Sequence, residues 1–276
     1  MRKVLHIIAV LLAFAAAPEA TARPDADRLA ALDSMVVRYV EAIRASDIGT
    51  KEAETDFMIS SCTDSLVRQR VALKLYSLYV DSPLMGEEAV AIHIYDTWFA
   101  TGRIAMASEP DLINARIFAD FNRNSLIGMD APVLLLRRPD GSSESLPRPG
   151  RSSILYFYDT GCSSCTAQSL LLPYVLEKAD FKIDLYAIYT GTDEQMWKTW
   201  TGDHLKIDNP LVTVHHLWDP EIESDYQRLY GILSTPRMYM VEPQGTLIGR
   251  RLDVESLGRL MIYAGALQNL YDKHLK

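Results

Sequence analysis

Two cysteines in the second half of the chain are the residues best suited to chemistry. Cys162 and Cys165 lie three apart in the stretch YDTGCSSCTAQ, directly after an apolar run. This spacing is found in redox pairs, in halves of metal sites and in structural disulfides. A zinc site needs about four ligands, and a disulfide that closes so short a loop gains little from chain entropy. The spacing therefore favours redox exchange, and the other two interpretations stay open.

The metal interpretation and one further alternative, a peroxidase, depend on other residues. His215 and His216 would have to complete a metal site, but they fall in a predicted strand, 215–218. A peroxidase with Cys162 as its peroxide-reducing residue would carry a Pro-x-x-x-Thr-x-x-Cys pattern, which is missing from this sequence. We therefore expect no metal ligands and no cofactor.

The elements around the pair explain why its position matters. The apolar run 154–158 predicts a buried strand, and 166–179 predicts a helix, so Cys162 lies between the end of a strand and the start of a helix. Free backbone N–H groups and the helix dipole stabilise an anion there. We expect a lowered pKa and nucleophilic attack by the Cys162 thiolate. Cys165, on the same helical turn, would resolve the mixed disulfide.

The rest of the second half alternates between strands and helices. A turn signal at Pro139-Asp140-Gly141 predicts a hairpin, and Asp253 is a candidate N-cap for the last helix. The remaining predicted strands are 183–189, 215–218, 237–241 and 246–251, and the remaining helices are 195–200 and 223–230. This order predicts an α/β sandwich with a mixed sheet.

The first half reads as helical. Apolar residues recur at spacings of three and four, and they predict helices around 29–43, 67–78, 90–98 and 113–121. We expect a small all-α domain over 23–124, followed by the α/β domain over 125–276. The helical half shows no catalytic spacing.

The N-terminus predicts secretion. Arg2 and Lys3 precede an apolar run from Val4 to Ala17, and an Ala-x-Ala site ends at Ala22. These are the parts of a signal peptide over 1–22, and the apolar run is shorter than a spanning helix needs. We expect a periplasmic or otherwise extracytoplasmic protein without stable membrane insertion.

Composition excludes one class of partner. The 276 residues carry a formal net charge of −8, with 48% hydrophobic and 23% charged residues, as in an ordinary globular protein. Binding to a phosphate backbone needs clustered Lys and Arg, and no long basic run is present. We expect no nucleic-acid partner.

The second half resembles the thioredoxin superfamily, and within it the extracytoplasmic TlpA/ResA-like thiol-disulfide oxidoreductases. The segment Gly128 to Pro132 is similar to the family's opening G-x-x-A-P, ILYFYDTGCSSC resembles its active-site segment, and YGILSTPRMYMVEPQGTLIGR resembles its second signature. The resemblance implies a thioredoxin-like fold with Pro236 as a cis-proline that faces the cysteines. Thr235 and Pro236 would then bind an extended substrate strand. The helical half resembles a domain of unknown function that precedes thioredoxin modules in some secreted bacterial proteins.

The chain departs from this family at the groups that move protons. Tyr156 stands where many thioredoxins have a buried Asp, and Gln168 stands where TlpA/ResA-like proteins often have a Glu. Asp159 is the nearest acid in the sequence, so it is a candidate for proton handling, or it only caps or turns the loop. Cys62 is interpreted as a small buried hydrophobe.

The leading hypothesis is a secreted thiol-disulfide oxidoreductase, acting as a reductase by analogy with the family it resembles. Its partners would be protein disulfides or thiols and a membrane or periplasmic electron donor. The alternative is a binding or adaptor protein on a thioredoxin scaffold, with a structural or vestigial disulfide and the helical domain as its working surface.

Overall fold

The chain divides into two compact units that meet in the sequence between Arg123 and Asn124. A computed structural model describes residues 26–274, and the predicted signal peptide, 1–22, lies outside this range. None of the helices between 26 and 274 combines the length and apolar character that crossing a bilayer requires.

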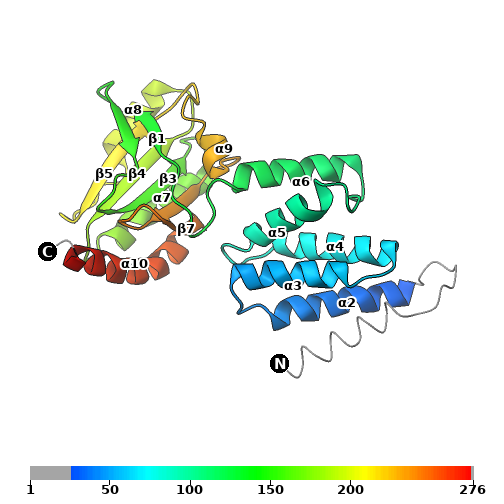
Figure 1. The fold of residues 1–276 in the computed structure, drawn as a ribbon. Helices are drawn as coiled ribbons and strands as arrows, with labels where there is room; N and C mark the ends of the chain where they lie inside the picture. Colours follow the sequence, from blue (N-terminus) through cyan, green and yellow to red (C-terminus); the bar gives the residue numbers. More distant parts are fainter. Residues whose placement is uncertain (1–25, 275–276) are drawn as a thin grey trace. The chain divides into compact units, whose positions relative to one another are not determined.

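The first unit is helical, as the sequence predicts (Figure 1). Its elements are α2 (Ala26–Ala42), α3 (Ile48–Ser60), α4 (Ser65–Val80), α5 (Glu88–Ile94), the π-helix η1 (Tyr95–Phe99) and α6 (Glu109–Asn122). Three of these helices begin at a side chain that accepts a hydrogen bond from the first turn: Asp47, Asp64 and Ser108.

Helix α3 was not predicted, because its buried face is partly polar. Lys51 and Thr55 are buried together with Met58 and Ile59, so the apolar repeat of an amphipathic helix is absent. The ammonium of Lys51 lies 2.6 Å from the carboxylate of Glu87, and both side chains are buried. A charge is tolerated in this core because it is paired.

The second unit is built on one seven-stranded mixed sheet, in the order β2-β1-β5-β4-β3-β6-β7. Its strands are β1 (Leu134–Arg137), β2 (Ser143–Leu146), β3 (Ser152–Tyr158), β4 (Ile183–Tyr189), β5 (Val212–Trp218), β6 (Arg237–Val241) and β7 (Leu247–Leu252). Strands β3, β4 and β5 are parallel, and Tyr158, Tyr189 and Trp218 are in register at their carboxyl ends. The loops after these three strands therefore meet at one edge of the sheet.

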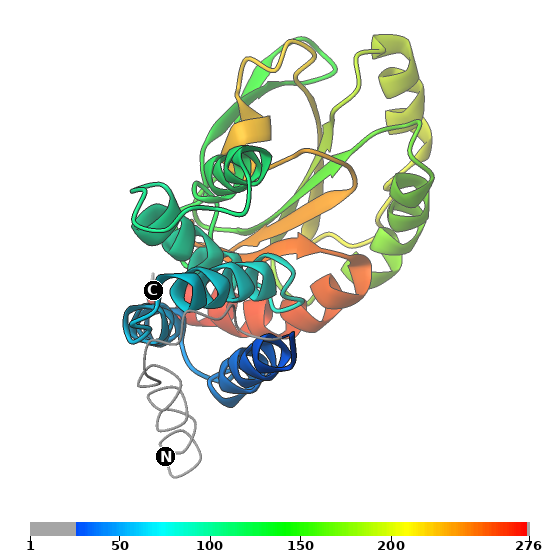
Figure 2. The same cartoon turned by 90° about the vertical axis from the view of Figure 1, so that its right-hand side faces the viewer.

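Helices cover both faces of this sheet (Figure 2). They are α7 (Ser163–Leu176), α8 (Glu194–Asp203), α9 (Tyr226–Tyr230) and α10 (Val254–His274). Alternate residues of β3 supply the two cores: Tyr156 and Tyr158 pack with α7, α8 and α10, and Leu155 and Phe157 pack with α9. The predicted α/β sandwich with a mixed sheet is confirmed.

Candidate active site

Cys162 caps the helix that follows the central strand. It is the N-cap residue of α7, and its Sγ accepts a hydrogen bond from the backbone N–H of Cys165 at 3.1 Å. An N-cap side chain satisfies a backbone donor that has no partner inside the helix. This position stabilises the thiolate form of Cys162, because the N–H group and the helix dipole both favour negative charge.

Thr235 lies beside Cys162, although 73 residues separate them in sequence. The Sγ atom of Cys162 lies 3.6 Å from the carbonyl oxygen of Thr235, and the Thr235–Pro236 peptide bond is cis. Antiparallel pairing of β3 with β6, with Phe157 opposite Arg237, carries this segment to the end of β3.

The two thiols differ in their access to solvent. All three cysteines of the chain lie within the described residues and are free; Cys162 is partly exposed, whereas the side chain of Cys165 is 1% exposed. A partner protein can therefore reach Cys162, and Cys165 faces the core.

Their pKa values move in opposite directions. Partial burial raises the pKa of Cys162, but hydrogen bonds from Cys165, from the Thr235 side chain and from the backbone of Ser164 outweigh it, and the pKa is lowered. Burial raises the pKa of Cys165 to about 11, and the neighbouring Cys162 adds to this shift. The pair thus combines a partly exposed thiol with a lowered pKa and a buried thiol with a raised pKa.

Asp159 shapes the loop that leads to Cys162. Its Oδ1 accepts a hydrogen bond from the backbone N–H of Gly161 at 2.7 Å, and its carbonyl accepts one from the N–H of Cys162 at 3.3 Å. These contacts form an Asx-type turn.

The Gln168 side chain connects α7 to the start of α10. Its Oε1 accepts a hydrogen bond from the backbone N–H of Val254, the first residue of α10, at 2.9 Å. Gln168, at the position where an acid was expected, therefore stabilises the N-terminus of α10.

Tyr156 contacts the helix that carries the cysteines, which the sequence analysis did not foresee. Its hydroxyl lies 2.9 Å from the carbonyl oxygen of Cys165 and 3.0 Å from Oγ of Ser169. No local pattern marks this contact, because it depends on the register of β3 against α7.

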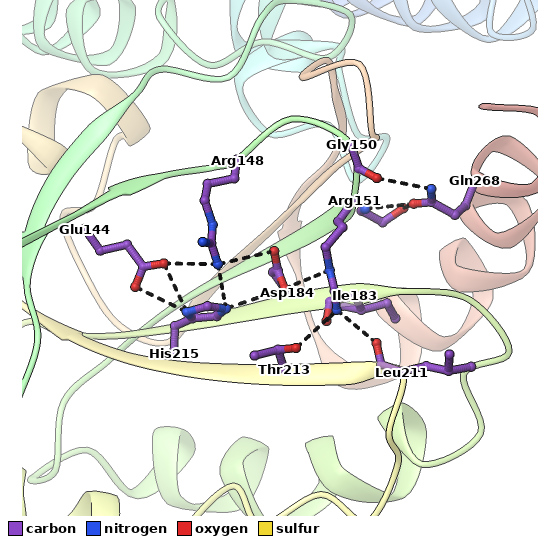
Figure 3. A network of polar contacts seen from close by, with 11 residues as sticks. Glu144, Arg148, Gly150, Arg151, Ile183, Asp184, Leu211, Thr213, His215 and Gln268 are labelled. Carbon is purple, nitrogen blue, oxygen red and sulfur yellow. Dashed lines mark hydrogen bonds and ion pairs between the residues drawn. The ribbon is translucent and has the colours of Figure 1, made fainter. Parts of the chain in front are cut away.

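His215 and His216, the two histidines that a metal site would require, lie in two different environments. His215 lies in a charged cluster near the start of the parallel strands, with Nδ1 3.1 Å from Glu144 and Nε2 3.5 Å from Asp184 (Figure 3). Arg148 and Arg151 complete this cluster. His216 is half-buried, and this burial together with His215 lowers its pKa to about 4. Across residues 26–274 no three His, Cys, Asp or Glu side chains are grouped so that they could hold a metal ion.

Cys62 is buried within the helical unit. Its thiol donates to the carbonyl oxygen of Met58 at 3.4 Å, and burial raises its pKa. A thiol with these properties is a poor nucleophile.

Comparison with solved structures identifies the fold. A thioredoxin-like protein from Bacteroides caccae superposes with a TM-score of 0.63 at 16% sequence identity, over 85% of this chain and 84% of that one. The chain has a thioredoxin-like fold. No protein-family model and no curated protein sequence matches it.

Two shorter solved structures match about half of the chain. The thioredoxin domain of a thiol-disulfide oxidoreductase from Bacteroides vulgatus covers 50% of this chain and 96% of its own length, at 20% identity and a TM-score of 0.42. A thiol:disulfide interchange protein from Bacteroides sp. covers 51% of this chain and 90% of its own length, at 21% identity and a TM-score of 0.41.

The arrangement in this thioredoxin-like protein has the parts that disulfide exchange requires. An accessible thiol with a lowered pKa can attack a disulfide. A second thiol one helical turn away can then displace the partner, and a backbone carbonyl beside the first sulfur offers a place for an extended chain.

Proposed function

We propose that the protein is a secreted thiol-disulfide oxidoreductase that acts on protein disulfides. The observation that carries this proposal is the contrast between Cys162, which is partly exposed with a lowered pKa, and Cys165, which is buried with a raised pKa. A permanent structural disulfide needs no such difference between its two sulfurs.

The reaction has two exchange steps. The Cys162 thiolate attacks one sulfur of a substrate disulfide, so a mixed disulfide forms and the other substrate sulfur leaves as a thiolate. Cys165 then loses its proton and attacks Sγ of Cys162, which releases the second substrate sulfur. The substrate gains two electrons, and the protein is left with a Cys162–Cys165 disulfide.

Thr235 and Pro236 are the proposed substrate-binding residues. The carbonyl of Thr235 lies beside the nucleophilic sulfur, where it can accept a hydrogen bond from the backbone of an extended substrate. Leu233, two residues earlier, is 66% exposed and offers apolar contact to the same chain. Extended protein segments are therefore the proposed substrates of this site.

The direction that we propose is reduction, with a membrane or periplasmic electron donor that returns the pair to its dithiol form. The predicted signal peptide supports an extracytoplasmic location. Disulfides persist in that compartment, so substrates for a reductase are present there.

For Asp159 we propose at most an accessory role in proton transfer. One of its carboxylate oxygens already accepts a hydrogen bond from Gly161, which an Asn side chain could also accept. Asp159→Asn is therefore expected to preserve the loop. A slower release of substrate from the mixed disulfide in this variant would support proton handling, and an unchanged rate would leave Asp159 as a turn residue.

Reduction of insulin by dithiothreitol tests the proposal. The purified protein should accelerate the reaction, and Cys162→Ser should abolish the acceleration. Cys62→Ser is the matched control: it also removes one thiol, and its hydroxyl can still donate to Met58, so activity should be retained. No acceleration by the wild-type protein would contradict the proposal and favour an adaptor on a thioredoxin scaffold.

A further inference from the structure

Two buried hydroxyl groups, those of Tyr156 and Ser169, connect strand β3 to helix α7 beside Cys165. The Tyr156 hydroxyl donates to the carbonyl oxygen of Cys165 and lies 3.0 Å from Oγ of Ser169. Since a phenol has one proton to donate, Ser169 must be the donor in the second contact. Tyr156, Cys165 and Ser169 are all buried, so no water competes for these bonds.

The part of α7 that these hydroxyl groups contact lacks one backbone hydrogen bond to the last turn of the helix. Pro173 lies inside α7, and proline has no backbone N–H to donate to the carbonyl of Ser169, four residues earlier. The first turns, which carry both cysteines, are therefore separated from the last turn by a missing hydrogen bond. Tyr156 contacts the helix on the cysteine side of this break.

We propose that Tyr156 is a positioning residue for the resolving cysteine. By binding the carbonyl of Cys165 it fixes the first turn of α7 and keeps the Cys165 thiol aligned with the sulfur of Cys162. The inference rests on the proposed function, because alignment matters only if Cys165 attacks a mixed disulfide.

The step that Tyr156 serves is the second exchange. Cys165 gives its proton to solvent, its thiolate forms a bond to Sγ of Cys162, and the bond between Cys162 and the substrate sulfur breaks. The substrate thiolate then takes a proton from solvent. Tyr156 exchanges no proton, since burial raises its pKa far above the ordinary value and the phenol stays neutral. Its contribution is alignment, which raises the effective concentration of one thiol beside the other.

The two steps can be observed separately with 5,5′-dithiobis(2-nitrobenzoic acid) in a stopped-flow spectrometer. Attack by Cys162 releases one coloured thiolate, and attack by Cys165 on the resulting mixed disulfide releases a second. A Cys62→Ser background removes the third thiol. In Tyr156→Phe the first phase should be unchanged and the second about fivefold slower, the effect of losing one buried hydrogen bond.

Two further variants sharpen the test. Ser169→Ala leaves the bond from Tyr156 to Cys165 in place, so its second phase should slow by only about twofold. Tyr158→Phe is the matched control: Tyr158 stacks on Tyr156 from the same face of β3, with ring centroids 5.5 Å apart, but its hydroxyl makes no hydrogen bond to α7. Both phases should keep their wild-type rates in this control.

The pH profile separates alignment from proton transfer. The slowing in Tyr156→Phe should be the same factor from about pH 6 to pH 9, because a neutral phenol acts through position alone. A factor that changes with pH, or a second phase as fast as in wild type, would overturn the inference. If Tyr156→Phe does not fold, an unchanged second phase in Ser169→Ala overturns it instead. Absence of the first phase in the wild-type protein would contradict the proposed function itself.

Discussion

The backbone N–H of Cys165 donates a hydrogen bond to Sγ of Cys162 at 3.1 Å. The residue that would resolve the mixed disulfide thus also stabilises the nucleophile. Because Cys165 lies in the first turn of α7, the two roles depend on the same short segment of backbone.

Cys162 should ionise below the pH at which an ordinary thiol does. Its pKa is lowered by hydrogen bonds that outweigh burial, whereas burial raises that of Cys165 to about 11. Alkylation by iodoacetamide, followed by mass spectrometry, should therefore show Cys162 reacting with a midpoint below that of an ordinary thiol. Cys165 should react with a midpoint near its raised pKa of about 11. Cys165→Ser isolates the first thiol, and a midpoint at or above the ordinary value would contradict the lowered pKa.

Asp184→Asn should lower the free energy of unfolding at neutral pH by about 1–2 kcal/mol, because it removes the buried carboxylate that pairs with the partly exposed guanidinium of Arg151. Burial raises the pKa of Asp184, but a hydrogen bond from His215 and the charge of Arg151 lower it by more. A lowered native pKa gives stability that is present above the unfolded value and lost as pH falls through the native one.

Urea unfolding at several pH values measures this effect. The difference between wild type and Asp184→Asn should be largest near pH 7 and should shrink below about pH 4. Asp208→Asn, at an exposed position before β5, is a control with the same chemical change. A difference that grows on acidification would contradict the predicted direction of the pH dependence.

Gln168→Glu should not accelerate the resolving step. The side chain accepts a hydrogen bond from Val254 at the start of α10, and a carboxylate there gains up to about 1 kcal/mol from the helix dipole. Gln168→Ala should cost about 1 kcal/mol, since the N–H of Val254 loses its partner. Thermal unfolding and the second phase of thiol exchange check both statements. A tenfold faster second phase in Gln168→Glu would show that this side chain reaches the cysteines.

Gly191→Ala should destabilise the edge of the sheet at which the cysteines lie. A Cβ atom at this position would lie 2.3 Å from the hydroxyl oxygen and 2.5 Å from the adjacent ring carbon of Tyr189, so the buried ring must move. We expect a loss of about 1–3 kcal/mol in chemical unfolding. Gly202→Ala, in α8 and with open space around it, is the control and should be neutral or stabilising. Equal effects at the two positions would contradict the steric explanation.

The strands and the position of the cysteine pair were predictable, because they follow from local patterns. The run Ile154 to Tyr158 predicts a buried strand, and Cys162 after it lies at the start of a helix in the structure. Helix α3 was not predictable in this way, since its core contains Lys51, whose partner Glu87 is 36 residues away.

The roles of Tyr156 and Gln168 could not be predicted, because they depend on contacts between residues far apart in the sequence. The sequence shows that position 156 holds a tyrosine in place of an acid. The hydrogen bond from Tyr156 to Cys165, however, depends on how α7 packs on β3. Gln168 likewise contacts Val254, 86 residues later. Contacts of this kind require the register of packed elements, which one sequence does not specify.

The redox equilibrium of the pair tests the central claim most directly. The protein is equilibrated across a series of glutathione buffers, its thiols are alkylated, and the mass of the fragment with Cys162 and Cys165 is measured. We predict a two-electron transition between dithiol and disulfide within this series, absent in Cys162→Ser. A pair that stays oxidised under the most reducing conditions would be a structural crosslink and would contradict the proposed exchange.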